Sequence, residues 1–240
     1  MGMPITVEIS DEAKAADLDK IFDYFMRVDE QYSPYKPTSE LSKVNAGLPR
    51  NKWSGEFQEI IRLCEQTKQE TQGYFDIEHN GKLDPSGLVK GWAIQQAAEQ
   101  LVASGFDNFY IEAGGDIQVH GSYQKDIPWS IGIRNPFNID EIIKVLQIRN
   151  QGVATSGTYI RGEHIYDPRA SYRAVHAVKS LTVIGPNIYE ADRLATAAFA
   201  MGEAGIGFIE VRPGFEGYQI DKNKVATYTS GFEDYVTATT

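Results

Sequence analysis

The sequence contains a single cysteine among its 240 residues. One cysteine cannot form an intrachain disulfide, and it excludes a structural zinc site built from several cysteines. Cys64 lies in an apolar helical pattern with Phe57, Ile60 and Ile61, so we expect it to be a small core residue. Histidine is also scarce, and His79, His120 and His176 are isolated in the sequence. We expect these three at the surface or at strand edges.

Basic residues are too few to balance the acidic ones. The chain has 23 Lys and Arg against 33 Asp and Glu, a formal net charge of −10, and no basic stripe. This charge balance argues against binding to a nucleic-acid backbone, so we expect no nucleic-acid partner. The net negative charge would repel an anionic small molecule, so such a ligand would have to be bound by a nearby metal cation, a lysine or backbone N–H groups.

Long apolar runs are absent, and no segment is long enough to span a bilayer. The sequence as written begins Met1-Gly2-Met3-Pro4 without a signal peptide or lipidation motif, so we expect a soluble, cytoplasmic protein. An exported form would need an N-terminal segment beyond this sequence.

The hydrophobic content of 42% is enough for a core. We expect a single domain over residues 1–240, with two lobes around a cleft as the alternative.

Hydrophobic periodicity predicts an α+β fold, with largely antiparallel sheets flanked by helices. Helices dominate the first half of the chain and strands the second. The expected helices cover residues 18–28, 39–45, 54–73, 86–104 and 189–202. The expected strands cover residues 5–9, 74–77, 109–113, 116–120, 129–134, 145–149 and 180–184, with a hairpin around 222–223.

The helix predicted over residues 189–202 places Asp192 and Thr196 on one face. At four-residue spacing the two Cβ atoms lie about 6 Å apart, so both oxygens can reach one hard cation such as Mg²⁺. The alternative is that Asp192 caps the first turn while Thr196 bonds back to its own helix. These two residues alone leave both interpretations open.

A second candidate stretch runs from Asp84 to Ala93 and reads DPSGLVKGWA. A glycine-containing turn that enters a helix exposes unpaired N–H groups, and Lys90 adds a positive charge one turn later. A phosphate could bind there, although taken alone the stretch slightly favours an ordinary helix start. The spacing fits neither a P-loop nor a Rossmann glycine motif. Gly114-Gly115 similarly indicates either a close approach to a ligand or a tight turn.

These segments, in this order, resemble the flavin transferase family, the FAD:protein FMN transferases. The resemblance covers nearly the whole chain. It rests on Met1-Gly2-Met3, Ser33-Pro34-Tyr35 with Ser39-Glu40-Leu41-Ser42 and Asn45, Phe75-Asp76-Ile77, the Asp84–Ala93 stretch, Gly114-Gly115-Asp116, Ala154-Thr155-Ser156-Gly157 with Tyr159, His164-Ile165 with Asp167-Pro168, and Asp192-x-x-x-Thr196.

The resemblance implies an ApbE-like architecture, with Mg²⁺ as cofactor and FAD as substrate. Such enzymes release AMP and attach FMN to a threonine of an acceptor flavoprotein. By motif, His164 resembles the general base. The implied metal ligands are the side chains of Asp192 and Thr196 and the carbonyl of Gly87. The implied FAD-binding residues are Met1, Tyr35, Tyr74, Phe75, Asp76, Asp84, Lys90 and Ile165.

The chain also departs from the family pattern. Only six residues separate Ile77 from Asp84, where family members carry a longer excursion, and Glu78 and Thr158 replace other residue types. These departures affect the choice of acceptor more than flavin binding. Two alternative functions remain beside the transferase: an FAD pyrophosphatase that uses water as nucleophile, and a non-catalytic FAD-binding protein.

Overall fold

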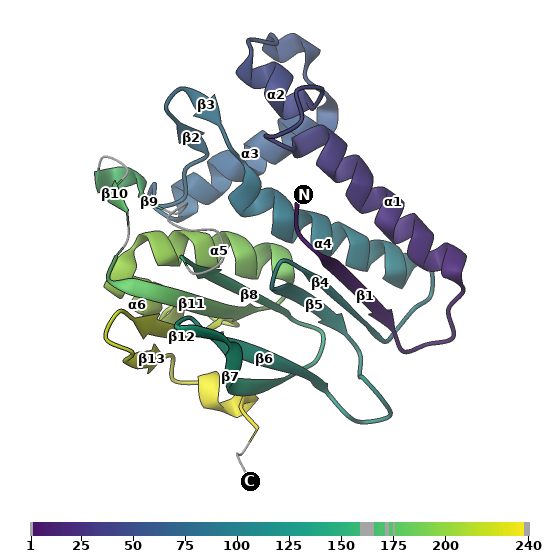
Figure 1. Cartoon of the computed structure of the whole chain (residues 1–240), viewed down its shortest axis with the longest axis vertical. Helices are drawn as coiled ribbons and strands as arrows, with labels where there is room; N and C mark the ends of the chain where they lie inside the picture. Colours follow the sequence, from purple (N-terminus) through teal and green to yellow (C-terminus); the bar gives the residue numbers. More distant parts are fainter. Residues whose placement is uncertain (1, 159–165, 171–172, 175, 238–240) are drawn as a thin grey trace.

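The computed structural model describes residues 2–158, 166–170, 173–174 and 176–237 of the chain. A seven-stranded sheet lies at its centre, with helices on one face and a two-stranded sheet on the other (Figure 1). Every strand pair in the central sheet is antiparallel. The predicted α+β class with largely antiparallel sheets is confirmed.

The central sheet has the strand order β1-β4-β5-β8-β11-β12-β13. The sheet separates two apolar layers: Leu181 and Val183 of β11 face the helices, while Ile184 faces the other layer. Its strands are β1 (Ile5–Ile9), β4 (Phe109–Ala113), β5 (Asp116–His120), β8 (Gly152–Gly157), β11 (Val178–Gly185), β12 (Glu216–Asp221) and β13 (Ala226–Tyr228).

Two long helices, α4 and α5, pack against each other and against the sheet. Both carry several buried alanines, and α4 also buries Gly91, which allows the backbones to approach closely. The remaining helices cover or extend this layer. The α-helices are α1 (Ala15–Tyr32), α2 (Glu40–Asn45), α3 (Gly55–Glu70), α4 (Ser86–Ala103), α5 (Ile188–Ala200) and α6 (Gly205–Glu210).

The opposite face of the sheet is covered by β6 (Trp129–Asn135) and β7 (Asn138–Ile148), which pair with each other. Trp129, Ile131 and Leu146 are buried there against strands of the central sheet. Two further short hairpins are β2 (Glu78–His79) with β3 (Lys82–Leu83), and β9 (Tyr166–Asp167) with β10 (Arg173–Ala174).

Most predicted elements agree with the structure to within a few residues, and Ser39 and Ser54 cap α2 and α3 as expected. The strand predicted over residues 74–77 is wrong, because this segment is irregular and the β2–β3 hairpin begins only at Glu78. Strand β6 does not extend the β4–β5 pairing, since β6 pairs with β7 and β5 pairs with β8. Cys64 is buried, as predicted.

Four short 3₁₀ helices complete the described elements: η1 (Arg50–Lys52), η2 (Pro168–Ala170), η3 (Gly202–Ala204) and η4 (Phe232–Tyr235). Within the described part of the chain, no helix combines the length and apolar character needed to cross a membrane.

Candidate functional site

A cavity of about 760 Å³ opens beside the helical layer. It is lined by the end of α2, the 74–84 segment with its hairpin, the start of α4, the β4–β5 turn, β8 and one face of α5. Both halves of the chain therefore contribute to its wall. Its volume lies within the about 300–1,000 Å³ range of small-molecule sites.

The cavity brings together most of the residues expected to bind FAD or a metal. Those that line it are Tyr74, Phe75, Asp76, Asp84, Gly87, Lys90, Asp192 and Thr196. Tyr35 is 89% exposed and is not among the described lining residues, although its neighbour Pro34 is. Met1, His164 and Ile165 lie outside the described residues, so their roles remain predictions.

Asp192 projects from the second turn of α5 towards α4. Helix α5 begins at Ile188 and is capped by Asn187, whose side chain accepts a hydrogen bond from the Glu190 N–H. The capping alternative for Asp192 is therefore wrong. Its Oδ2 instead accepts a hydrogen bond of 2.8 Å from the Gly91 N–H, which fixes the carboxylate between the two helices.

Thr196 lies one turn further along α5 and faces the first turn of α4. Its hydroxyl lies 3.5 Å from the carbonyl oxygen of Gly87, a long hydrogen bond between the two helices. A Cβ at position 87 would lie 3.2 Å from the Thr196 methyl and 3.3 Å from the Phe75 ring. Glycine at position 87 thus allows the carbonyl and the hydroxyl to approach each other.

Lys90 links the Asp192 carboxylate to a second buried one. Its Nζ lies 2.5 Å from Oδ2 of Asp116 and 3.6 Å from Oδ1 of Asp192. Asp116 begins β5 directly after the Gly114-Gly115 turn, and both glycines have positive φ. This left-handed pair forms the tight turn that the sequence left open, and Gly114 also lines the cavity.

The electrostatics of this cluster favour a cation. Burial raises the pKa of Asp192 well above its usual range, the Lys90 ammonium opposes that rise, and Asp116 adds to it. With both acids ionised, two buried carboxylates would face one ammonium. An additional cation near Asp192 would offset the remaining negative charge and favour ionised Asp192.

The donor set around this cluster fits a magnesium ion. Magnesium prefers oxygen ligands and commonly takes several of them from water and substrate phosphates. Gly87, Asp192 and Thr196 line the same cavity and offer three oxygen donors, a carbonyl, a carboxylate and a hydroxyl, from α4 and α5. Among the residues that the structure describes, no group of three His, Cys, Asp or Glu side chains could hold a metal, so a thiolate or imidazole site is not an alternative there.

The 74–84 segment forms one cavity wall and is held by side-chain contacts. Asn45 donates to the carbonyl oxygen of Leu83 over 2.9 Å and accepts from its N–H over 2.8 Å. Asp76 accepts from the Glu78 N–H and pairs with Lys68 at 2.7 Å. These contacts stabilise an irregular segment that has few ladder hydrogen bonds of its own.

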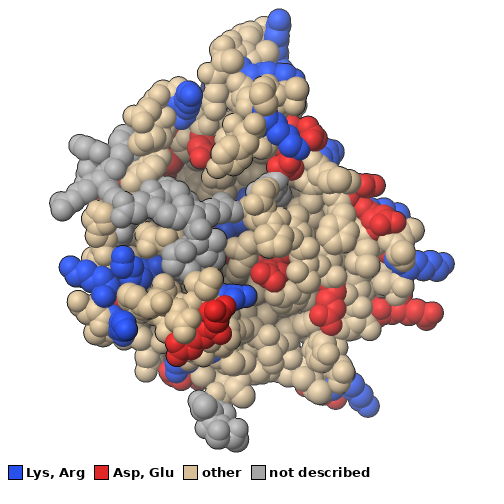
Figure 2. Space-filling model, viewed as in Figure 1, with Lys and Arg blue, Asp and Glu red and all other residues tan. Residues whose placement is uncertain are grey.

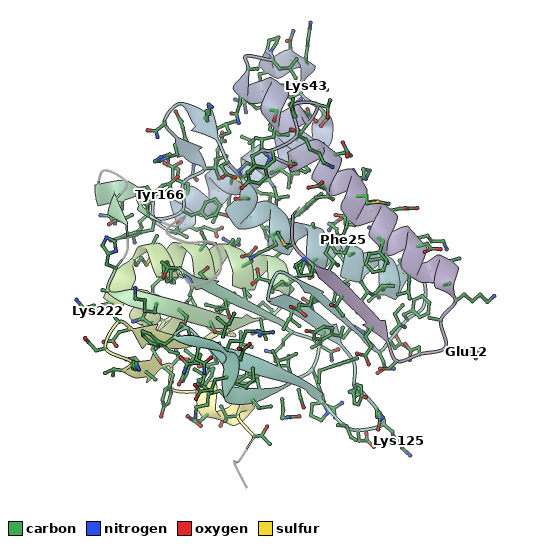
Figure 3. The ribbon with its side chains drawn as sticks, viewed as in Figure 1. Glu12, Phe25, Lys43, Lys125, Tyr166 and Lys222 are labelled. Atoms are coloured by element: carbon green, nitrogen blue, oxygen red, sulfur yellow. The ribbon has the colours of Figure 1, made fainter. Side chains whose placement is uncertain are left out.

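Aromatic groups border the same wall. The rings of His79 and Tyr166 lie 4.6 Å apart, centre to centre, and Figure 3 places Tyr166 beside the β2–β3 hairpin. The Arg169 guanidinium lies 4.6 Å from the centre of the Tyr74 ring. His79 lies on an edge strand, in the two-stranded β2–β3 hairpin, and it also lines the cavity. Asp167 accepts a hydrogen bond from the Arg169 N–H, which caps the turn at Pro168.

Sequence reasoning missed the role of Asp116, the Asn45 clamp and the placement of His79. The sequence carried one signal for Asp116: an acidic residue follows directly after the Gly114-Gly115 pair, at the start of a predicted strand. A carboxylate is rarely buried in such a strand without a charged partner.

On the face shown in Figure 2, acidic and basic side chains are interspersed and form no continuous basic stripe.

Comparison with known proteins gives a consistent result. The model of the ApbE family matches residues 1–81 and 77–218. A Haemophilus influenzae protein named FAD:protein FMN transferase is 34% identical over 131 residues, which cover 50% of this chain and 38% of that protein. A Vibrio cholerae protein of the same name is 29% identical over 167 residues, covering 65% of this chain and 48% of that protein. The matched regions thus span less than half of these relatives.

Solved structures show the same fold. The Vibrio cholerae structure described as flavin transferase ApbE has a TM-score of 0.85 at 22% identity, covering 98% of this chain and 96% of that chain. An ApbE protein from Thermotoga maritima has a TM-score of 0.84 at 22% identity, with 98% and 96% covered. The architecture predicted from the sequence is confirmed.

Proposed function

Because the chain belongs to the ApbE family, we propose that it is a magnesium-dependent FAD:protein FMN transferase. It would cleave FAD, attach FMN to a threonine of an acceptor flavoprotein and release AMP. One observation carries the proposal: eight of the nine described residues expected to bind FAD or Mg²⁺ line one cavity. Relatives of the chain carry the same activity in their names.

The cavity supports binding of a dinucleotide by an acidic protein. Lys90 is a local positive charge at the cavity wall, and Asp192, Thr196 and the Gly87 carbonyl would hold the metal ion. When bound, Mg²⁺ would neutralise pyrophosphate charge that this acidic chain would otherwise repel. The Tyr74 ring and the buried Phe75 supply apolar surface for a flat ring system.

The transfer step needs a nucleophile, a leaving group and a proton acceptor. The threonine oxygen of the acceptor forms a bond to the phosphorus on the FMN side, and the bond from that phosphorus to the bridging oxygen breaks. AMP leaves with the electron pair. In the proposal His164 takes the hydroxyl proton, because a threonine hydroxyl is hardly ionised at neutral pH.

One experiment separates the three candidate functions. The protein is incubated with FAD and Mg²⁺, with and without a flavoprotein acceptor, and the products are analysed by liquid chromatography and mass spectrometry. AMP together with a flavinylated threonine supports the transferase. Free FMN and AMP without acceptor would indicate a pyrophosphatase, and intact FAD with folded protein and a proven acceptor would indicate a non-catalytic binder.

A further inference from the structure

Lys90 has two possible carboxylate partners, and the structure shows an unequal choice between them. Its ammonium nitrogen lies 2.5 Å from Asp116 and 3.6 Å from Asp192. Both contacts are ion pairs, but the first is the shorter by about 1 Å. Lys90 is therefore paired closely with Asp116 and more loosely with Asp192.

Asp116 is built into the sheet as a fixed partner. Its side chain is fully buried, and its Oδ1 accepts a hydrogen bond of 3.1 Å from the Thr155 N–H on the neighbouring strand β8. The Thr155 hydroxyl in turn lies 2.8 Å from that of Thr182 on β11. The carboxylate on β5 is thus held by Thr155 of β8, which is itself held by Thr182 of β11, and this leaves it little freedom to follow a moving lysine.

The position of the ammonium matters because a lysine next to a metal-binding carboxylate competes with the cation. If Asp116 carried no charge, the Lys90 ammonium would be drawn towards the other carboxylate with which it pairs among the described residues, Asp192. A close Lys90–Asp192 pair would satisfy that carboxylate and place a positive charge where a divalent cation must bind.

We propose that Asp116 is a positioning residue that holds the Lys90 ammonium away from Asp192 and so keeps the Asp192 carboxylate available to a divalent cation. This inference rests on the proposed function, because it assumes that Asp192 binds the metal. In this role Asp116 acts through Lys90, although it is also a direct electrostatic neighbour of Asp192.

A double-mutant cycle tests this dependence. Mn²⁺ is used as the probe without FAD, and bound Mn²⁺ is measured by electron paramagnetic resonance for wild type, Asp116→Asn, Lys90→Met and the double variant. We expect Asp116→Asn to weaken Mn²⁺ binding by about 10–100-fold, the usual range for an outer-shell change. Adding Lys90→Met to Asp116→Asn should restore most of the lost Mn²⁺ affinity. In the wild-type background, Lys90→Met should change the Mn²⁺ affinity far less.

A matched control and a second comparison keep the test decisive. Glu70→Gln also removes one carboxylate from a 2.5 Å pair with a buried cation, Arg193, outside the cavity lining, and it should leave Mn²⁺ binding unchanged. If Asp116→Asn does not fold, the double variant is compared with Lys90→Met: equal affinities support the inference, since Asp116 then has no lysine to position.

Three results would contradict it. Equal Mn²⁺ affinity of folded Asp116→Asn and wild type would overturn the positioning role while leaving the proposed function intact. A loss that Lys90→Met does not restore would overturn it as well, because Asp116 would then act independently of Lys90. Failure of the wild type to bind Mn²⁺ would instead contradict the metal assignment of Asp192, and the inference would fail with it.

Discussion

Gly91 and Asp192 are in direct contact across the interface of α4 and α5. The Gly91 N–H donates a 2.8 Å hydrogen bond to the Asp192 carboxylate, and a Cβ at position 91 would lie 2.7 Å from the Asp192 Cβ and 2.8 Å from the Ile188 carbonyl oxygen. Real Cβ atoms do not approach backbone so closely, so residue 91 must be glycine for the helices to keep this spacing.

Gly91→Ala should therefore destabilise the protein by about 1–3 kcal/mol, because the added methyl forces the helices apart. The free energy of unfolding from denaturant titration measures this effect. Gly207→Ala is the matched control: Gly207 lies in helix α6 with nothing within 4 Å of its Cβ position, so alanine there should stabilise by about 0.5–1 kcal/mol. Equal effects of the two substitutions would contradict the packing argument.

Asp192→Asn should remove the stabilisation that Mg²⁺ gives the protein. The amide keeps an oxygen for the Gly91 N–H but loses the charge that attracts the cation. At a Mg²⁺ concentration about 100 times Kd, the wild type should gain about 2.7 kcal/mol, and the variant little. Thermal melts with and without Mg²⁺ measure this difference. Glu190→Gln is the control, because Glu190 lies on the same helix but pairs with Arg193, and this variant should keep the full stabilisation by Mg²⁺. If Asp192→Asn were also stabilised by Mg²⁺, Asp192 would not be a metal ligand.

His164→Ala should slow FMN transfer by about 10²–10⁴-fold, the usual contribution of a general base. FAD binding should be spared, because the proposed role concerns only the proton of the acceptor hydroxyl. Single-turnover transfer and equilibrium FAD binding are measured side by side. An unchanged transfer rate would require a different base, for which His79 at the cavity wall is the first alternative to test.

Asn45→Ala should weaken FAD binding more than it weakens the fold. The side chain holds Leu83 through two hydrogen bonds, and their loss releases the β2–β3 hairpin from α2 at a cost of about 1–2 kcal/mol. The Kd for FAD should rise, as measured by quenching of flavin fluorescence. Asn138→Ala removes an exposed asparagine far along the sequence and should leave the Kd unchanged. Identical Kd values for Asn45→Ala and wild type would contradict the role of the clamp.

The sequence predicted those elements whose signals are local. The apolar spacing of α1, the Ser54 cap of α3 and the alternation in β4 each depend on neighbours in the chain, and the structure reproduces them. The 74–77 segment has the β-rich composition of a strand, yet it forms none. Its backbone is instead held by side chains, including the hydrogen bond from the Phe75 N–H to Thr71.

Local sequence signals predicted the site residues that share one segment, such as Asp192 and Thr196 on one helix face and Lys90 in the Asp84–Ala93 stretch. The pairing of Lys90 with Asp116 joins α4 to β5 through tertiary contact, and no spacing in the sequence encodes it. The same holds for the Asn45–Leu83 clamp, whose partners lie 38 residues apart. Long-range polar contacts of this kind are set by how the layers pack, after local structure is fixed.

A last prediction concerns acid stability at the edge of the sheet. Asp11 accepts hydrogen bonds from the N–H groups of Asp107 and Asn108 and from the Asn108 side chain, at 2.7–2.8 Å. Partial burial alone would raise the pKa of Asp11, but the hydrogen bonds from Asn108 and Asp107 outweigh it and lower the pKa below its usual value. The ionised carboxylate is therefore the form that stabilises the connection into β4.

Because the folded-state pKa of Asp11 is lowered, its contribution to stability is present above the unfolded-state pKa of about 3.9 and is lost as the pH falls through the folded-state value. Asp11→Ala should thus cost about 1–2 kcal/mol at pH 7, and the difference from wild type should shrink below about pH 3. Urea unfolding at both pH values measures it, with the exposed Asp23→Ala as a control that should change little. A difference that stays the same at low pH would mean that Asp11 acts through its shape and not through its charge.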